Sequence, residues 1–332
     1  MTGSVLLTGA NGSLAIPMVK YLLDAYPDFT LILTVRDDSE ADKNTAELRK
    51  VVAGHSDAVT SIRKLDLASL KEVETFCNDL RSEIGNGKLP RLSAIICNAM
   101  SWRLSGGPSY TEDGYETTMA INHLAQFSLS LRLIDSMDAQ RGRIVFLGSE
   151  AHHPLRAAFS KGYPTAIYSD LDLHVHPEPD KPEEGLGRGF QRYGTSKLVT
   201  VMVAYELNRR LKQNKDTESI RVVTIDPQNL IDSKTFMRSH VPMFIKVLMT
   251  IGSWLLPLLR LFQPALASVQ QAAKPVVDLA VADEYTGQEG YFEGNAKVGS
   301  SFYSLIESVQ GMLWAKSVEW CGLRAEDSVI EL

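Results

Sequence analysis

The chain has 332 residues, 44% hydrophobic and 22% charged, which is the composition of a globular protein with a substantial core. A net charge of −6 and the lack of a long basic run exclude the electrostatic footprint of a nucleic-acid-binding protein. The three cysteines are widely spaced, and no histidine–carboxylate cluster has the spacing of metal ligands. The lack of ligand spacing predicts that no metal is bound. Because the N-terminus shows no secretory signal pattern, we expect a cytoplasmic protein.

Strand-like and helix-like segments alternate through the first half of the chain. Apolar strands without polar alternation are typical of a parallel sheet covered on both faces. This order predicts a Rossmann-like, doubly wound α/β fold with helices on both faces and ligands at the carboxyl ends of the strands. The predicted strands are 5–8, 31–35, 61–65, 94–97 and 144–147, and the predicted helices are 15–25, 40–52, 70–80 and 115–137.

The second half departs from this alternation in two places. Prolines and glycines gather in residues 154–192, which predicts a long inserted loop. A helix over 193–211 and a strand over 221–225 follow, and an apolar insert occupies 230–266. Since no linker separates these pieces from the first half, we predict a single domain over 1–332.

A glycine-rich turn joins the first predicted strand to the first helix, with the spacing G-x-x-G-x-x-A. Such a turn lets the backbone approach a pyrophosphate, and the helix N-terminus offers free N–H groups. A tight turn without a ligand is the alternative, but the position in the first βα unit favours a dinucleotide. The residues predicted to contact it are Thr8, Gly9, Asn11, Gly12, Ser13 and Leu14.

The end of the second strand bears on the choice of cofactor. A carboxylate there would bind the ribose 2′-hydroxyl of NAD, whereas an arginine accommodates the 2′-phosphate of NADP. Arg36 comes first after the strand, followed by Asp37 and Asp38, and this order predicts NADP(H). A solvated surface arginine, partly neutralised by the two aspartates, is the alternative.

Tyr193 and Lys197 are spaced so that they share one face of a predicted helix, one turn apart. A tyrosine with its ordinary pKa of about 10 is a poor acid or base at neutral pH, but a nearby cation favours the phenolate. The pair can therefore exchange a proton with a carbonyl or alcohol oxygen while a nicotinamide carries the hydride. The spacing alone also occurs by chance on ordinary helix surfaces.

The ordered set of motifs resembles the short-chain dehydrogenase/reductase family over nearly the whole chain. Segments 144–152 and 169–173 look closest to retinol-dehydrogenase-like and 3-ketosteroid-reductase-like members, and the apolar insert resembles members found in fungal natural-product pathways. The motifs are the glycine turn, Asp66, Cys97-Asn98-Ala99, Ile121-Asn122-His123, Gly148-Ser149-Glu150, Tyr193 and Lys197.

This resemblance implies a role for each motif residue. Tyr193 would be the proton donor or acceptor, and Lys197 would hold the nicotinamide ribose and lower the pKa of the phenol. Ser149 would hydrogen-bond the reacting oxygen, and Asn122 would anchor a water in a proton relay to Lys197. The further cofactor contacts that it implies are Asp66 and Leu67, Asn98 and Ala99, and Pro227, with Asp66 at the adenine ring and Asn98 on the adenosine side.

The sequence departs from the family pattern at several positions. Ser13 and Ala15 replace two glycines of the usual turn, Met100 replaces the glycine of N-N-A-G, and Gln228 replaces the glycine of P-G. These changes motivate an alternative function, a non-redox isomerase, cyclase or scaffold. His152 and His153 follow Ser149, and a structural role is the favoured interpretation for both, with substrate contact as the alternative.

The apolar stretch 241–262 is interrupted by a proline, and its uncharged run falls short of the ~20 residues that span a membrane. We predict a lid over an apolar pocket, with a helix lying on the surface of an internal membrane as the alternative. Either indicates a bulky apolar substrate such as a terpenoid, steroid, polyketide or alkaloid. The predicted function is NADP(H)-dependent interconversion of a carbonyl and a secondary alcohol in secondary metabolism. The resemblance also implies a homodimer or homotetramer paired through helices 115–137 and 193–211.

Overall fold

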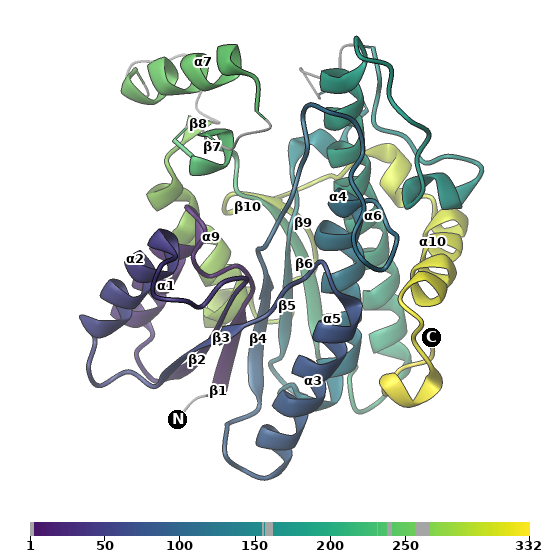
Figure 1. Cartoon of the computed structure of the whole chain (residues 1–332). Helices are drawn as coiled ribbons and strands as arrows, with labels where there is room; N and C mark the ends of the chain where they lie inside the picture. The colour runs from purple at the N-terminus through teal and green to yellow at the C-terminus, as the bar shows by residue number, and fades with distance from the viewer. Residues whose placement is uncertain (1–2, 155, 157–161, 231, 238–240, 256–265) are drawn as a thin grey trace.

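The computed structural model describes residues 3–154, 156, 162–230, 232–237, 241–255 and 266–332. Within them lies an eight-stranded sheet in the order β10-β9-β6-β5-β4-β1-β2-β3 (Figure 1). Pairing is parallel from β3 across to β9, and β10 is antiparallel to β9. The strands are β1 Gly3–Leu7, β2 Phe29–Val35, β3 Thr60–Lys64, β4 Leu92–Cys97, β5 Arg143–Leu147, β6 Arg221–Asp226, β9 Gly290–Glu293 and β10 Ala296–Val298.

Helices cover both faces of the sheet, each over its own hydrophobic core (Figure 1). Successive side chains of a strand point to opposite faces, so Leu6 enters one core while Val5 and Leu7 enter the other. This confirms the predicted doubly wound α/β fold. One face carries α1 Ala15–Ala25, α2 Lys43–Ala53 and α9 Val269–Val281; the other carries α3 Leu70–Gly85, α5 Ala125–Leu133, α6 Gly185–Gln213 and α10 Glu307–Trp320.

The strand order changes direction between β1 and β4, which places a switch point at their carboxyl ends. A second, two-stranded parallel ladder pairs β7 Asn229–Leu230 with β8 Leu266–Ala267. The predicted apolar insert 230–266 therefore leaves and rejoins the rest of the chain at this ladder.

The helix predicted over 115–137 is divided into several pieces. It comprises α4 Thr117–Met119, a π-helical turn Ala120–Leu124, and α5, followed by a 3₁₀ turn. π-turns widen a helix by one residue and are frequent at functional sites. Asn122, a predicted catalytic residue, lies in this turn.

The helix predicted to begin at Tyr193 begins earlier, at Gly185, so the predicted loop 154–192 ends at residue 184. The glycines of this stretch favoured a loop on propensity alone. In the structure, a Cβ at Gly189 would lie 2.3 Å from the backbone oxygen of Arg103. The glycine allows α6 to pack directly on that backbone, and this tertiary contact outweighs the poor helix propensity.

The C-terminal helix α10 packs against α6 (Figure 1), and its side chains reach α5 and the π-turn before it. His123 Nε2 lies 2.7 Å from Ser317 Oγ, Arg132 pairs with Asp327, and Trp314 packs on Phe127. Every residue of α5 is buried. The predicted pairing of copies through this helix is therefore wrong, because α10 already covers it, whereas the oligomeric state itself stays a prediction.

The apolar stretch 241–262 contains α7, Met243–Trp254, and its residues 256–262 lie outside the described part of the chain. Ile245 is buried against a cluster that includes Trp102 and Phe190. The exposed apolar residues of α7 are Met243, Phe244, Val247, Leu248, Ile251 and Trp254. Across the described residues, no helix is both long and apolar enough to cross a membrane. Contact with a membrane surface stays a prediction.

Gly189→Ala should destabilise the protein by about 1–3 kcal/mol, the usual cost of overpacking, because the added methyl group collides with the Arg103 backbone. Gly185→Ala, on the same helix but with open space around it, should stay within about 0.5 kcal/mol of wild type. Urea unfolding of both variants measures the difference. Equal stabilities would show that α6 does not rely on this close approach.

Candidate active site

A cavity of about 880 Å³ lies at the carboxyl ends of the central strands. It extends from the glycine turn after β1 to the start of α6 and the end of β6. Thr8 and Asn122 are the predicted site residues that do not line it. The predicted residues that do line it are Gly9, Asn11, Gly12, Ser13, Leu14, Arg36, Asp66, Leu67, Asn98, Ala99, Ser149, Tyr193, Lys197 and Pro227.

The glycine turn is fastened to the end of β4. Asn98 Nδ2 donates to the carbonyl oxygens of Thr8 at 2.9 Å and Gly9 at 3.2 Å, and the Ala99 N–H donates to Thr8 Oγ1 at 3.1 Å. Gly9 has φ 63°, and a Cβ there would lie 2.9 Å from Ala99 Cβ. Thr8 therefore supports the turn from below, and Gly9 is required both for its backbone conformation and for the close contact.

Two polar side chains of the turn reach other segments. Asn11 Nδ2 donates to Thr45 Oγ1 at 2.9 Å, at the start of α2, and Ser13 Oγ lies 3.0 Å from Ser233 Oγ. The segment 232–237 thus forms a wall of the cavity opposite the turn. This segment lies inside the predicted apolar insert 230–266, but no motif marked its individual residues as site residues.

Arg36 and Asp37, the charged residues that follow the second predicted strand, lie at the end of β2. Arg36 is exposed, and it lines the cavity together with Asp37. Hydrogen bonds from Ser39 lower the pKa of Asp37, and the charge of Arg36 adds to this effect. An arginine and an ionised carboxylate therefore stand side by side at the predicted position of the ribose 2′-substituent.

Ser149 and Tyr193 meet in the cavity despite their separation along the chain. Ser149 follows β5, and Tyr193 lies on α6, where burial raises the pKa of the phenol to about 12 while the Ser149 hydroxyl opposes this rise. Lys197 Nζ donates to the Leu147 oxygen at 2.6 Å and lies 5.8 Å from the centre of the Tyr193 ring. Burial dominates the pKa of the phenol in this arrangement, and the lowering of that pKa by Lys197 stays a prediction.

Burial also lowers the pKa of Lys197 to about 8. Asp226, at the end of β6, opposes this through its charge and lines the same cavity. Burial raises the pKa of Asp226 itself to about 6. The site therefore holds three buried titratable groups, Tyr193, Lys197 and Asp226, each shifted toward its neutral form.

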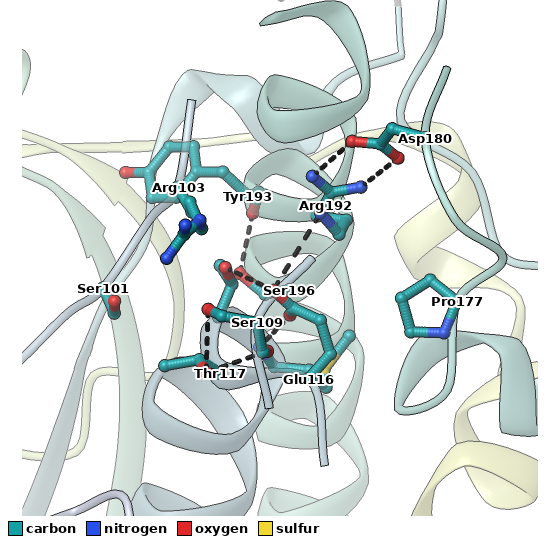
Figure 2. A network of polar contacts seen from close by, with 12 residues as sticks. Ser101, Arg103, Ser109, Glu116, Thr117, Pro177, Asp180, Arg192, Tyr193 and Ser196 are labelled. Atoms are coloured by element: carbon teal, nitrogen blue, oxygen red, sulfur yellow. Dashed lines mark hydrogen bonds and ion pairs between the residues drawn. The ribbon is translucent and has the colours of Figure 1, made fainter. Parts of the chain in front are cut away.

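Arg192, next to Tyr193 in sequence, fastens the inserted loop to α6 (Figure 2). Its guanidinium donates to both carboxylate oxygens of Asp180, at 2.7 and 2.8 Å, and lies 3.9 Å from Glu116. Figure 2 shows Arg192 pointing toward Asp180 while the Tyr193 ring points to the side of Ser101 and Arg103. The long insert thus folds back and clamps the helix beside the predicted catalytic tyrosine.

Asn122 connects the π-turn to the loop after β4. Its Oδ1 accepts the Ser101 N–H at 2.7 Å, and its Nδ2 donates to the Ser101 oxygen at 2.9 Å and to Ser196 Oγ at 3.0 Å. These contacts use both N–H donors of the side-chain amide and one lone pair of its oxygen, so Asn122 positions the loop at Ser101 against α6. The proposed water relay through Asn122 stays a prediction.

His152 has a structural role. Its Nδ1 lies 2.7 Å from the Ser149 oxygen and its Nε2 accepts the Ser301 N–H at 2.9 Å, an arrangement that requires the Nδ1–H tautomer. Burial lowers its pKa to about 4. Neither His152 nor His153 lines the cavity, so the suggested substrate contact is wrong for this structure.

Several cavity residues were missed as site residues from the sequence. Gln228 has a φ of 70°, in the left-handed region where the family pattern has glycine, and its N–H donates to Asp226 Oδ1 at 2.7 Å. Aromatic residues line the side toward α7, and only their spatial clustering reveals them. The missed residues are Trp102, Phe190, Asp226, Gln228, Ser233, Thr235 and Phe236.

Comparisons with known proteins point to one family. The family model for short chain dehydrogenases matches residues 4–165, and that for the AcuH dehydrogenase domain matches 240–330. Short-chain dehydrogenase iccH of Talaromyces variabilis is 29% identical over 99% of this chain and 98% of that protein. Retinol dehydrogenase 14 of Homo sapiens is 26% identical over 96% of this chain and 86% of that protein.

Solved structures share the fold. The NADPH-bound carbonyl reductase from chicken fatty liver superimposes with a TM-score of 0.56 at 15% identity, covering 90% of this chain and 99% of that one. A protein from Mycobacterium paratuberculosis gives a TM-score of 0.64 at 22% identity, covering 96% and 93%. The chain belongs to the short-chain dehydrogenase/reductase family, of the retinol-dehydrogenase-like kind, and is a carbonyl/alcohol oxidoreductase.

Burial of Lys197 should make stability depend on pH. The folded protein releases this proton near pH 8, whereas the unfolded chain retains it up to the ordinary value of 10.5. The unfolded state binds more protons between these values, so this group makes the folded state more stable as pH rises through them.

Lys197→Met should remove this pH dependence. The free energy of unfolding of the variant should therefore exceed that of wild type most at pH 7, and the difference should shrink toward pH 10. Lys215→Met, at an exposed site, is the control and should show no such trend. Urea unfolding at pH 7, 8, 9 and 10 measures it. A constant difference between Lys197→Met and wild type would contradict the argument.

Proposed function

We propose that the protein uses NADP(H) to interconvert a ketone and a secondary alcohol on a bulky apolar substrate in secondary metabolism. The observation that supports this most is the meeting of Ser149, Tyr193 and Lys197 in one cavity that continues to the glycine turn. The glycine turn lines one part of this cavity, and the aromatic side chains of Trp102, Phe190 and Phe236 line another. A scaffold without chemistry would have no need for all three groups there.

The groove has the features that a dinucleotide requires. Gly9 and Gly12 leave the turn open where a Cβ would crowd its neighbours, and the backbone of 12–14 leads into α1. We assign the adenine side to Asp66, Leu67 and Asn98, and the 2′-phosphate to Arg36. When bound, the nicotinamide supplies or accepts the hydride.

The residues of the chain handle the proton and the developing charge. Tyr193, with a pKa of about 12, is protonated at neutral pH and can donate to the oxygen of a ketone as that oxygen gains negative charge. The Ser149 hydroxyl donates to the same oxygen and stabilises its charge. Lys197, with a pKa of about 8, is mostly cationic at pH 7, and its field favours the phenolate that remains.

The substrate side is apolar. Trp102 and Phe190 pack together with Val241 and Ile245, which precede and begin α7. We propose that α7 acts as a lid over this side. A lid of this kind excludes water and favours a substrate with a large apolar body, consistent with relatives named for retinol.

Tyr193→Phe should lower turnover of an accepted ketone by about 10²-fold or more, since it removes the proton donor. NADPH binding, followed by quenching of protein fluorescence, should remain close to wild type. Tyr205→Phe, on the same helix but bonded to Ser300, is the matched control and should keep full activity. Undiminished turnover in Tyr193→Phe would rule out the proposed acid, and absent NADPH binding by the wild type would favour the non-redox alternative.

Arg36→Ala should weaken NADPH binding by about 10-fold or more, because a charge-assisted bond to the 2′-phosphate is lost. NADH binding should change little, so the ratio of the two dissociation constants reports the role of Arg36 directly. Arg141→Ala, an exposed arginine at the opposite end of the sheet, should leave both constants unchanged. A wild type that prefers NADH would assign the ribose to Asp37 instead.

A further inference from the structure

Trp102 lies in the loop after β4, and its indole N–H is buried without a hydrogen-bond partner among the described residues. The side chain is only 6% exposed, and it lines the cavity that holds Tyr193. A buried donor without an acceptor is costly, so native proteins rarely leave one unless a ligand or water completes it.

The indole is held in place on several sides. Its ring packs edge-on against Phe190, Tyr193 and Phe236, with centroids 5.7, 5.3 and 5.2 Å away. Its neighbour Ser101 is bound by the side chain of Asn122. The next residue is Arg103, and α6 packs against its backbone at Gly189. Trp102 is therefore a preorganised donor and not a mobile loop side chain.

Other tryptophans show what is particular to this position. Trp320 donates its N–H to Asp172 at 2.9 Å. Trp314 also has an unpartnered N–H, but it lies in the hydrophobic core between α5 and α6, with the Arg210 guanidinium over its ring. Trp102 differs from both because its unpartnered donor belongs to a side chain that borders the cavity.

The reacting oxygen is not the natural acceptor for this N–H. A carbonyl oxygen has two lone pairs, and in the proposed function Tyr193 and Ser149 donate to both. The ring of Trp102 packs directly on the ring of Tyr193, so a substrate bound at the tyrosine also lies beside the indole. A second oxygen on the substrate, close to the reacting carbon, would complete the unpartnered donor.

We propose that Trp102 is a specificity-determining residue whose N–H binds a second oxygen of the substrate, and this rests on the proposed function. The substrate class is then an apolar ring system with two oxygen functions, one reacting at Tyr193 and one, a ketone, hydroxyl or ether oxygen, held by Trp102. A site built around a donor discriminates against ligands that lack the acceptor, because the donor is then left unpaired.

The test compares decalin-1-one with decalin diones whose second carbonyl is at C4, C5 or C6, using NADPH oxidation. Wild type should prefer at least one dione, and Trp102→Phe should lower kcat/KM for it about 10-fold more than for the monoketone, the effect of one hydrogen bond. Trp314→Phe, which also removes a buried unpartnered N–H, should not change the preference. Equal losses on all ketones, or a parallel loss of NADPH affinity, would overturn the proposal.

A second readout does not depend on turnover. The four tryptophans give four indole N–H resonances in ¹⁵N-labelled protein, and the one missing from Trp102→Phe is that of Trp102. The preferred dione should shift this resonance downfield, and decalin-1-one should not. A shift without NADPH oxidation would count against the proposed function alone. If reduction depends on Tyr193 but no dione is preferred and none shifts the Trp102 resonance, the result would count against the proposed role of Trp102 alone.

Discussion

The close approach of α6 to the loops after β4 and β5 is the constraint on which the site depends. Glycine makes it possible at two points: a Cβ at Gly189 would meet the Arg103 oxygen at 2.3 Å, and one at Gly194 would meet Thr165 Oγ1 at 2.1 Å. Thr165 in turn donates to the Ala151 oxygen at 2.8 Å. These contacts bring Tyr193 between the loop that carries Trp102 and the loop that follows Ser149. If side chains at these two glycines held α6 farther from the sheet, the Tyr193 phenol would be separated from both loops.

The same packing sets the electrostatics. Because α6 is buried where it carries Tyr193 and Lys197, both side chains lose water, and burial is the largest cause of each pKa shift. The phenol becomes a weaker acid and the ammonium a stronger one, so the two pKa values move apart, from 10.0 and 10.5 to about 12 and about 8. Asp226 limits the second shift by its charge. Tight packing thus has an electrostatic cost, which is usual for sites that must move protons.

Local sequence patterns were sufficient to predict the elements whose structure depends on residues close together in the chain. The apolar strands and the turn at Gly9 follow from side-chain period and backbone freedom, and α1 has its predicted bounds, Ala15–Ala25. Long-range contacts were not readable in this way. The start of α6 depends on the Arg103 backbone, and the covering of α5 depends on α10, which is far away in the chain. The unpartnered N–H of Trp102 is likewise visible only once the aromatic cluster is assembled.

Gln228 shows how one departure from the family pattern is compensated. Left-handed backbone is strained for a residue with a Cβ, and such strain persists only where surrounding contacts enforce it. Here the Asp226 carboxylate accepts the Gln228 N–H at 2.7 Å, and the backbone oxygen of Asp226 accepts the Gly294 N–H at 3.1 Å. Asp226 therefore holds the turn with one carboxylate oxygen while its charge acts on Lys197. A single buried carboxylate thereby couples the shape of the cavity wall after β6 to the protonation of the lysine beside the predicted catalytic tyrosine.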